Sequence, residues 1–186
     1  RLLEMQEEVG NRFLLARAIG ALGELARAKG KLDDAEEQYR RALEIHESIG
    51  SRLTWMTRLN LGLVLLARGD YSGNLDMVTT VEAELGRGAE PSQLCLLHMQ
   101  RLPSVAVAKD KPAWNRHLKE AERLLEETGH NESAVAWILD LGAEKAKSNG
   151  WRNEAKDAFR LASAQWAGLG RDDLAARIDD KIERMN

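Results

Sequence analysis

Cysteine and proline are scarce in this sequence. A single cysteine, Cys95, cannot form an internal disulfide, and this cysteine usage is typical of a reducing compartment. There are only three prolines, and Ala, Leu, Glu, Arg and Lys dominate, so the composition favours helix throughout. No uninterrupted run of about 18 apolar residues occurs, and the sequence therefore predicts no membrane span.

An excess of charge of one sign is also missing. The formal net charge is −3, with acidic and basic residues interspersed, so the sequence predicts no nucleic-acid partner for this chain. Hydrophobic residues make up 44% and charged residues 31%, which indicates a soluble folded chain rather than a disordered one. The sequence shows neither a signal peptide nor an initiator methionine, so we expect a fragment of a longer cytoplasmic protein.

The residue patterns of common active sites and metal sites are missing as well. No metal-ligand spacing relates Cys95 to the four histidines, which are His46, His98, His117 and His130. No glycine-rich phosphate loop follows a strand, and no serine occupies a nucleophile elbow. Cys95 and His98 could pair on a helix, but they lack an oxyanion arrangement, so we interpret Cys95 as a buried small apolar residue. We expect no catalytic residue, no metal, no cofactor and no enzymatic activity.

What the sequence does contain is an internal repeat. Residues 18–50 show a helical pattern, a turn at Gly30 and a second helical pattern, and later segments follow with a period of about 40 residues. Residues 3–10 also match residues 43–50 position for position, which predicts the end of a second helix whose partner lies upstream. The predicted units are the end of a truncated repeat over 1–10, repeats over 11–50, 51–90, 91–129 and 130–170, and a capping helix over 171–186.

Periodicity within the repeats predicts how the helices begin, end and pack. One apolar face is expected on the first helix, built from Leu14, Leu15, Ala18, Leu22, Leu25 and Ala26. Turns are predicted at Gly30, Gly69, Asp110 and Gly150, and hairpin ends at Gly10, Gly50, Gly129 and Gly170. The predicted N-caps are Asp33, Asn131 and Asn153. Pro103 inside a helix predicts a kink or break near Leu102.

Small and aromatic residues at fixed spacings give the repeat a family likeness. The first repeat carries Leu22-Gly23 followed by Ala35, Tyr39 and Ala42, and the fourth carries Leu141-Gly142-Ala143 followed by Ala155, Phe159 and Ala162. This pattern resembles the tetratricopeptide repeat, in the subclass of roughly 40 residues found in animal polarity adaptors and bacterial signalling regulators. The resemblance implies an all-α fold, a right-handed α-α superhelix of antiparallel hairpins with a C-terminal capping helix.

The resemblance also implies a function. In such a solenoid the first helices of the hairpins line a concave groove that binds a protein or peptide segment. The implied groove residues are Arg17, Glu24, Arg27, Met56, Leu59, Asn60, Leu63, Gln100, Arg101, Trp137, Asp140, Glu144 and Lys147. We expect a non-enzymatic binding scaffold of undetermined oligomeric state. Two alternatives stay open: the chain is an effector-sensing or peptide-sensing domain of a larger bacterial transcription regulator or signalling kinase, and Met56, Leu59 and Leu63 are packed core.

Overall fold

The computed structural model describes the backbone of residues 2–185 and the side chains of residues 7–185. Within these bounds the chain forms nine α-helices and no strand, so the expected all-α fold is confirmed. The helices are α1 (Leu2–Ala28), α2 (Leu32–Ser48), α3 (Thr54–Arg68), α4 (Tyr71–Leu85), α5 (Pro91–Val107), α6 (Lys111–Thr128), α7 (Ser133–Ser148), α8 (Arg152–Gly168) and α9 (Asp172–Glu183). They form two compact units, one ending at Gly86 and one beginning at Arg87. None of the described helices is long and apolar enough to cross a membrane.

The first unit consists of the antiparallel hairpins α1/α2 and α3/α4. Within the first hairpin, Gly23 lets α1 approach α2 closely, because a Cβ at this position would lie 2.9 Å from the Tyr39 ring. Tyr39 and Ala35 of α2 are fully buried and form one apolar cluster with Leu61 and Val64 of α3. The small residue and the aromatic residue of the repeat therefore hold two hairpins together, as the sequence pattern predicts.

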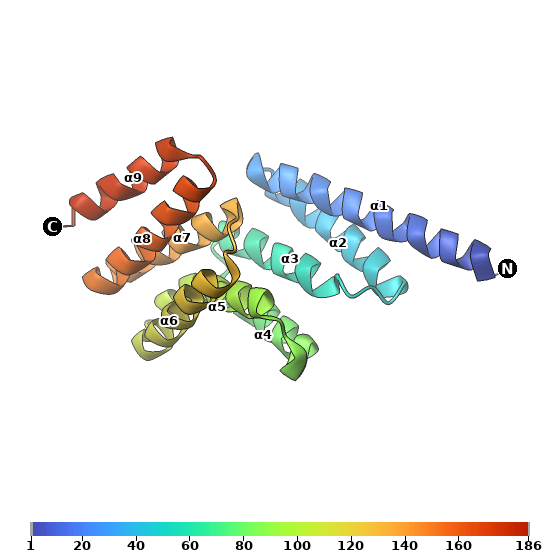
Figure 1. Ribbon diagram of the computed structural model, residues 1–186, viewed down its shortest axis with the longest axis horizontal. Coiled ribbons are helices and arrows are strands. Elements are labelled where there is room, and N and C mark those ends of the chain that lie inside the picture. The colour runs from blue at the N-terminus through green and yellow to red at the C-terminus, as the bar shows by residue number, and fades with distance from the viewer. Residues whose placement is uncertain (1, 186) are drawn as a thin grey trace. The chain divides into compact units, whose positions relative to one another are not determined.

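Helix α1 is longer than predicted. It runs without interruption over 27 residues, so the expected hairpin end at Gly10 is not formed. Figure 1 shows its first turns extending past the end of α2. Adding residues to an existing helix is favourable, whereas a turn needs another helix to pack against. Nothing among the described residues packs on the far side of Gly10, where a Cβ would meet no atom within 4 Å.

The structure also overturns most of the predicted apolar face of α1, of which only Ala26 packs against the core. The side chains of Leu14, Leu15, Leu22 and Leu25 are 50–60% exposed, and Ala18 is exposed as well. Contact with α2 is instead made through a neighbouring face that holds Ala16, Ile19 and Gly23. The small residues of that face bring the two helices close together, which leaves the larger leucines on the other side of α1.

The turns follow the predicted glycine spacing, but the N-caps do not. Left-handed backbone occurs at Gly30, Gly69 and Gly150, and at Gly50, Gly129 and Gly170 between hairpins. In the third repeat Lys109 takes this conformation at φ 58°, and Asp110 caps α6 by accepting a hydrogen bond from the Ala113 amide. The cap positions of α2, α7 and α8 are Lys31, Glu132 and Trp151, so Asp33, Asn131 and Asn153 are not caps.

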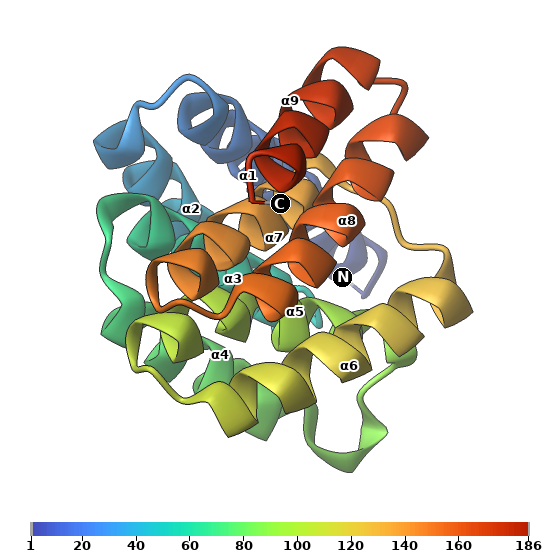
Figure 2. The same ribbon diagram turned by 90° about the vertical axis from the view of Figure 1, so that its left-hand side faces the viewer.

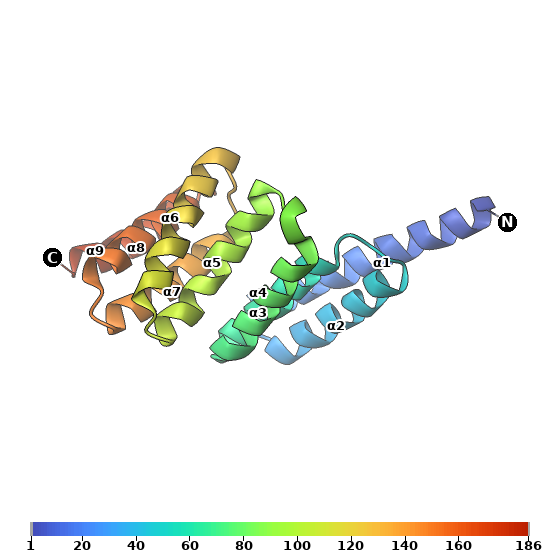
Figure 3. The same cartoon turned by 90° about the horizontal axis from the view of Figure 1, so that it is seen from below.

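The second unit contains the hairpins α5/α6 and α7/α8 and the single helix α9. Helix α5 continues through Pro103, so of the predicted kink or break the break is wrong, and the kink stays a prediction. The lost backbone bond costs about 3 kcal/mol, and the packing of α5 against α6 and α7 compensates for it. Figure 3 shows α5 and α6 side by side, and Figure 2 looks onto α8 with α9 next to it. Ala175 and Ile178 of α9 are buried, which gives the predicted covering helix.

Candidate functional site

The first helices of three hairpins carry an accessible side chain at one shared repeat position. Met56 follows Arg17 at the same sequence separation at which Gly69 follows Gly30. Trp137 follows Arg17 at the same separation at which Gly150 follows Gly30. Arg17 is exposed, Met56 is 41% exposed and Trp137 is half-buried. We call Arg17, Met56 and Trp137 the first-helix row. In the first unit its members Arg17 and Met56 lie on α1 and α3, which contact each other.

Other predicted groove residues of the first unit differ in their surroundings. Glu24 is exposed, and Arg27 lies beside the buried hydroxyl of Tyr39. Burial raises the pKa of Tyr39, and Arg27 offsets part of this effect. Asn60 is half-buried on α3, whereas Leu59 and Leu63 are each 4% exposed. The packed-core alternative therefore describes Leu59 and Leu63 but not Met56.

In the second unit, Gln100 and Arg101 on α5 are buried, while charged residues on α7 remain at the surface. The structure brings Asp140 and Glu144 of α7 together around Lys181 of α9, whose Nζ lies 3.2 Å from Glu144 Oε1. Lys147 pairs with Glu144 at 3.7 Å. Burial lowers the pKa of Lys181, but hydrogen bonds from its ammonium group to the Asp140 and Glu144 carboxylates outweigh this and raise the pKa overall. Sequence spacing gives no signal for this cluster, because Lys181 lies on a separate helix.

A histidine pair is a second feature that sequence spacing does not indicate. The Nδ1 atoms of His98 on α5 and His117 on α6 lie 2.8 Å apart, and both side chains are half-buried. Cys95 lies one helical turn before His98, and its Sγ donates weakly to the Ala121 carbonyl. Burial raises the pKa of the Cys95 thiol to about 12, which matches the buried apolar role predicted for it. No three metal-ligating side chains gather anywhere in the described part of the chain.

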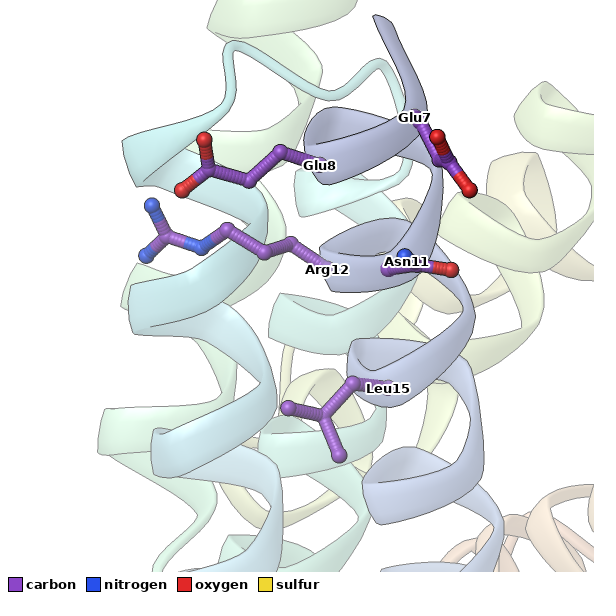
Figure 4. Close-up of a pocket in the computed structure, with 5 residues that line it drawn as sticks. All are labelled: Glu7, Glu8, Asn11, Arg12 and Leu15. Carbon is purple, nitrogen blue, oxygen red and sulfur yellow. The ribbon is translucent and has the colours of Figure 1, made fainter. Parts of the chain in front are cut away.

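A shallow hollow of about 380 Å³ lies on α1 itself. It is lined by Glu7, Glu8, Asn11, Arg12 and Leu15 (Figure 4). Glu8 and Arg12 extend to the same side of the helix, and Arg12 Nη2 donates to Ser48 Oγ of α2 at 2.9 Å. None of the predicted groove residues lines the hollow.

Comparisons with known proteins agree with this architecture. A family model described as tetratricopeptide repeat matches residues 15–49. The structure resembles a kinesin light chain assigned in Podosopora anserina with nearly identical TPR-like repeats, at a TM-score of 0.55 and 12% identity, over 91% of this chain and 93% of that one. It also resembles BtubC (BKLC) from P. vanneervenii, at a TM-score of 0.56 and 15% identity, over 100% of this chain and 91% of that one. Comparison with curated protein sequences finds no match.

These likenesses agree with the local packing. Residues 15–49 cover most of the α1/α2 hairpin, where Gly23 packs against Tyr39. At this level of identity the solved structures show the fold of the chain and nothing about its role. The first hairpin is a tetratricopeptide repeat, in an all-α chain with the fold of tetratricopeptide-like solenoids.

Proposed function

We propose that the chain binds protein or peptide segments through its first-helix row, the first unit through Arg17 and Met56 and the second unit through Trp137. The observation that carries the proposal is the shared repeat position of Arg17, Met56 and Trp137, none of which is buried. On the helices of Met56 and Trp137, the large apolar residues Leu63 and Leu139 are by contrast buried. A flexible thioether, an indole and a guanidinium are side chains enriched in protein interfaces.

The polar residues near this row favour a peptide over a small ion or a cofactor. Asn60 is half-buried on α3, and its amide offers both a donor and an acceptor to a peptide backbone. Glu24 on α1 is exposed, and Asp140 and Glu144 on α7 supply the acidic charge of the second unit. The first helices of each unit therefore present an accessible apolar side chain and a carboxylate, a mixed surface suited to recognising a segment by apolar anchors and charge.

The test is selection of peptides on the wild-type chain, followed by affinity measurements on single variants. Random 12-residue peptides displayed on phage are selected, synthesised and titrated by fluorescence anisotropy. Met56→Ala should weaken peptides that bind the first unit about tenfold or more, and Trp137→Ala should do the same for peptides that bind the second unit, as expected for interface anchors. Arg41→Ala and Lys119→Ala, on the exposed faces of α2 and α6, are the matched controls and should change affinity little. Peptides that bind all four variants equally would refute the proposed surface.

A further inference from the structure

Helix α1 carries an apolar stripe that no described residue covers. Its members are Leu14, Leu15, Ala18, Leu22 and Leu25, and we call them the outer stripe. The four leucines are 50–60% exposed. Folded monomeric chains rarely leave so many large apolar side chains along one helix in water. The outer stripe is separate from the first-helix row, since it shares no residue with it.

The repeat itself shows what such a stripe contacts. The step from Gly30 to Gly69 carries Leu22 to Leu61 and Leu25 to Val64 on α3. These two residues are 4% and 1% exposed, and they pack in one cluster with Ala35 and Tyr39 of the preceding second helix, α2. The equivalent face of α3 is therefore the contact surface between consecutive hairpins.

Helix α7 gives an independent instance of the same contact. The step from Gly30 to Gly150 carries Leu22 to Gly142, where a Cβ would lie 3.3 Å from Leu102 and from the Trp114 ring of the preceding hairpin. The same step carries Leu15 and Ala18 to Val135 and Ile138, which are 0% and 2% exposed. Positions that are exposed on α1 are thus covered by a preceding hairpin on both α3 and α7.

The surface that covers these positions has a recognisable chemistry. On α2 it consists of a small residue and an aromatic residue one turn apart, followed by a second small residue: Ala35, Tyr39 and Ala42. The corresponding residues of α8, which are Ala155, Phe159 and Ala162, are fully buried, and α9 packs on this helix. Val78 and Val81 of α4 and Trp114 and Ala121 of α6 are buried too. A folded second copy has no free second-helix surface of this kind to offer to the outer stripe.

The charged residues of the contact between hairpins indicate which charge the docked helix carries at its start. Arg68, in the last turn of α3, pairs with Asp33 and Glu36 in the first two turns of α2. The residue at the position of Arg68 in the first hairpin is Lys29, which directly follows α1 and is exposed. A helix lying on the outer stripe as α2 lies on α3 would bring its first turns to Lys29, and acidic side chains there would be favourable.

We propose that the outer stripe docks the second helix of another helical hairpin of this repeat type, supplied from outside residues 1–186. The docked helix carries a small residue and an aromatic residue one turn apart, and acidic residues at its start. The hollow beside Leu15 belongs to the same docking surface and takes up side chains near the end of the docked helix. Contact of α1 with α2 is unaffected, because it uses the face of Ala16, Ile19 and Gly23.

The test supplies such a hairpin covalently and asks whether the outer stripe becomes buried. In the extended chain, a second copy of residues 11–50 is joined to Asn11 in place of residues 1–10. The end of this copy matches the sequence of the residues that it replaces. Its melting midpoint is compared with that of the 186-residue chain, with and without the double change Leu22→Glu and Leu25→Glu in the original α1. Leu169→Glu, at an exposed leucine outside the stripe, is the matched control in both chains.

We expect the double change to lower the melting midpoint of the extended chain by roughly 10 °C, and that of the 186-residue chain by no more than the control does. Equal effects of the double change in the two chains would overturn the proposal. So would a dimer of the 186-residue chain in sedimentation equilibrium that the double change dissociates, because a second copy would then cover the stripe. None of the substituted residues belongs to the first-helix row, so peptide binding through that row can fail without affecting this result.

Discussion

At the scale of single residues, the contact between Gly23 and Tyr39 decides how closely α1 and α2 approach. A Cβ at Gly23 would lie 2.9 Å from two atoms of the Tyr39 ring, and Tyr39 is fully buried. Gly23→Ala should therefore overpack the hairpin and lower the free energy of unfolding by about 1–3 kcal/mol. Urea unfolding followed by circular dichroism measures this change.

Gly20 is the matched control for this substitution. It lies on the same helix, and a Cβ there would meet no atom within 4 Å. Gly20→Ala should leave stability unchanged or raise it by up to about 1 kcal/mol, because alanine favours helix. If the two substitutions had the same effect, the close approach at Gly23 would be wrong.

Burial decides the chemistry of Cys95 in a similar way. The side chain is inaccessible, and burial raises the pKa of its thiol to about 12, so the reactive thiolate is essentially absent at neutral pH. In the folded chain, the reaction of Cys95 with Ellman's reagent at pH 8 should be at least about a hundredfold slower than in 8 M urea. Comparable rates in the two conditions would show that the α5/α6 interface opens readily.

At the scale of elements, Gly10 tests whether α1 is one continuous helix. Gly10 has helical backbone here, with open space around a Cβ. Gly10→Ala should therefore stabilise the chain by about 0.5–1 kcal/mol in urea unfolding. Gly30→Ala is the contrasting variant, because Gly30 has a φ of 72° and alanine there is strained. A loss of stability from Gly10→Ala would instead indicate a turn at this glycine.

The helices and their turns were predictable from the sequence, whereas the exposed side of α1 was not. Glycines at regular steps mark the turns, because only glycine adopts a left-handed backbone at little cost. The leucines of α1 recur at helical spacing, and this pattern is the same whether the face packs on the partner helix of the hairpin or on a preceding hairpin. The caps were missed because the left-handed Gly30 and Gly150 close the preceding helices, and the next helix then begins without a side-chain cap at Lys31 or Trp151.

The α1/α2 hairpin should also respond to acid through His46. This side chain is 3% exposed, lies edge-on to Phe13 with ring centroids 5.9 Å apart, and has a pKa that burial lowers from its ordinary value of 6.5. Below pH 6.5 the unfolded chain binds a proton more readily than the folded chain does. The stability contributed by neutral His46 is thus complete above pH 6.5 and is lost as the pH falls through and below this value.

We expect the free energy of unfolding to decrease between pH 7.5 and pH 5.5, and His46→Leu to make this decrease smaller. His130→Leu is the control for the loss of a histidine side chain elsewhere in the chain. Glu36 responds in a lower range, because its hydrogen bonds to Arg40 and Arg68 lower its pKa from 4.5, so its contribution is lost only under more acidic conditions. If His46→Leu left the slope between pH 7.5 and pH 5.5 unchanged, the burial of a neutral His46 would be refuted.

At the scale of the whole molecule, the sequence predicted which residues share a repeat position. It did not predict which of the candidate site residues are buried or which side chains contact each other. The repeat step alone aligns Arg17, Met56 and Trp137, so their common position could be predicted. The burial of Gln100 and the pairing of Asp140 with Lys181 could not, because they depend on the packing of helices distant in sequence. The contact of His98 with His117 was missed for the same reason.

The local character of the contacts between hairpins should also determine how the molecule unfolds. Each hairpin contacts mainly its neighbours, so the stability of such a chain is close to a sum of local contributions. Tyr39 and Phe159 occupy the same repeat position in the two units, and both are fully buried. Tyr39→Ala and Phe159→Ala should each remove about 3–5 kcal/mol of local stability. Hydrogen exchange measured by mass spectrometry under native conditions reports these losses helix by helix.

Tyr39→Ala should accelerate exchange in α1, α2 and α3 and leave α7, α8 and α9 as protected as in the wild type. Phe159→Ala should do the reverse, because the Phe159 side chain packs in α8 under Lys181 of α9. The two variants serve as controls for each other, since they delete a ring of similar size from the same position of two repeats. Exchange that accelerates equally in all the described helices of either variant would mean that the chain unfolds as one cooperative body, and the nearest-neighbour account of its stability would then fail.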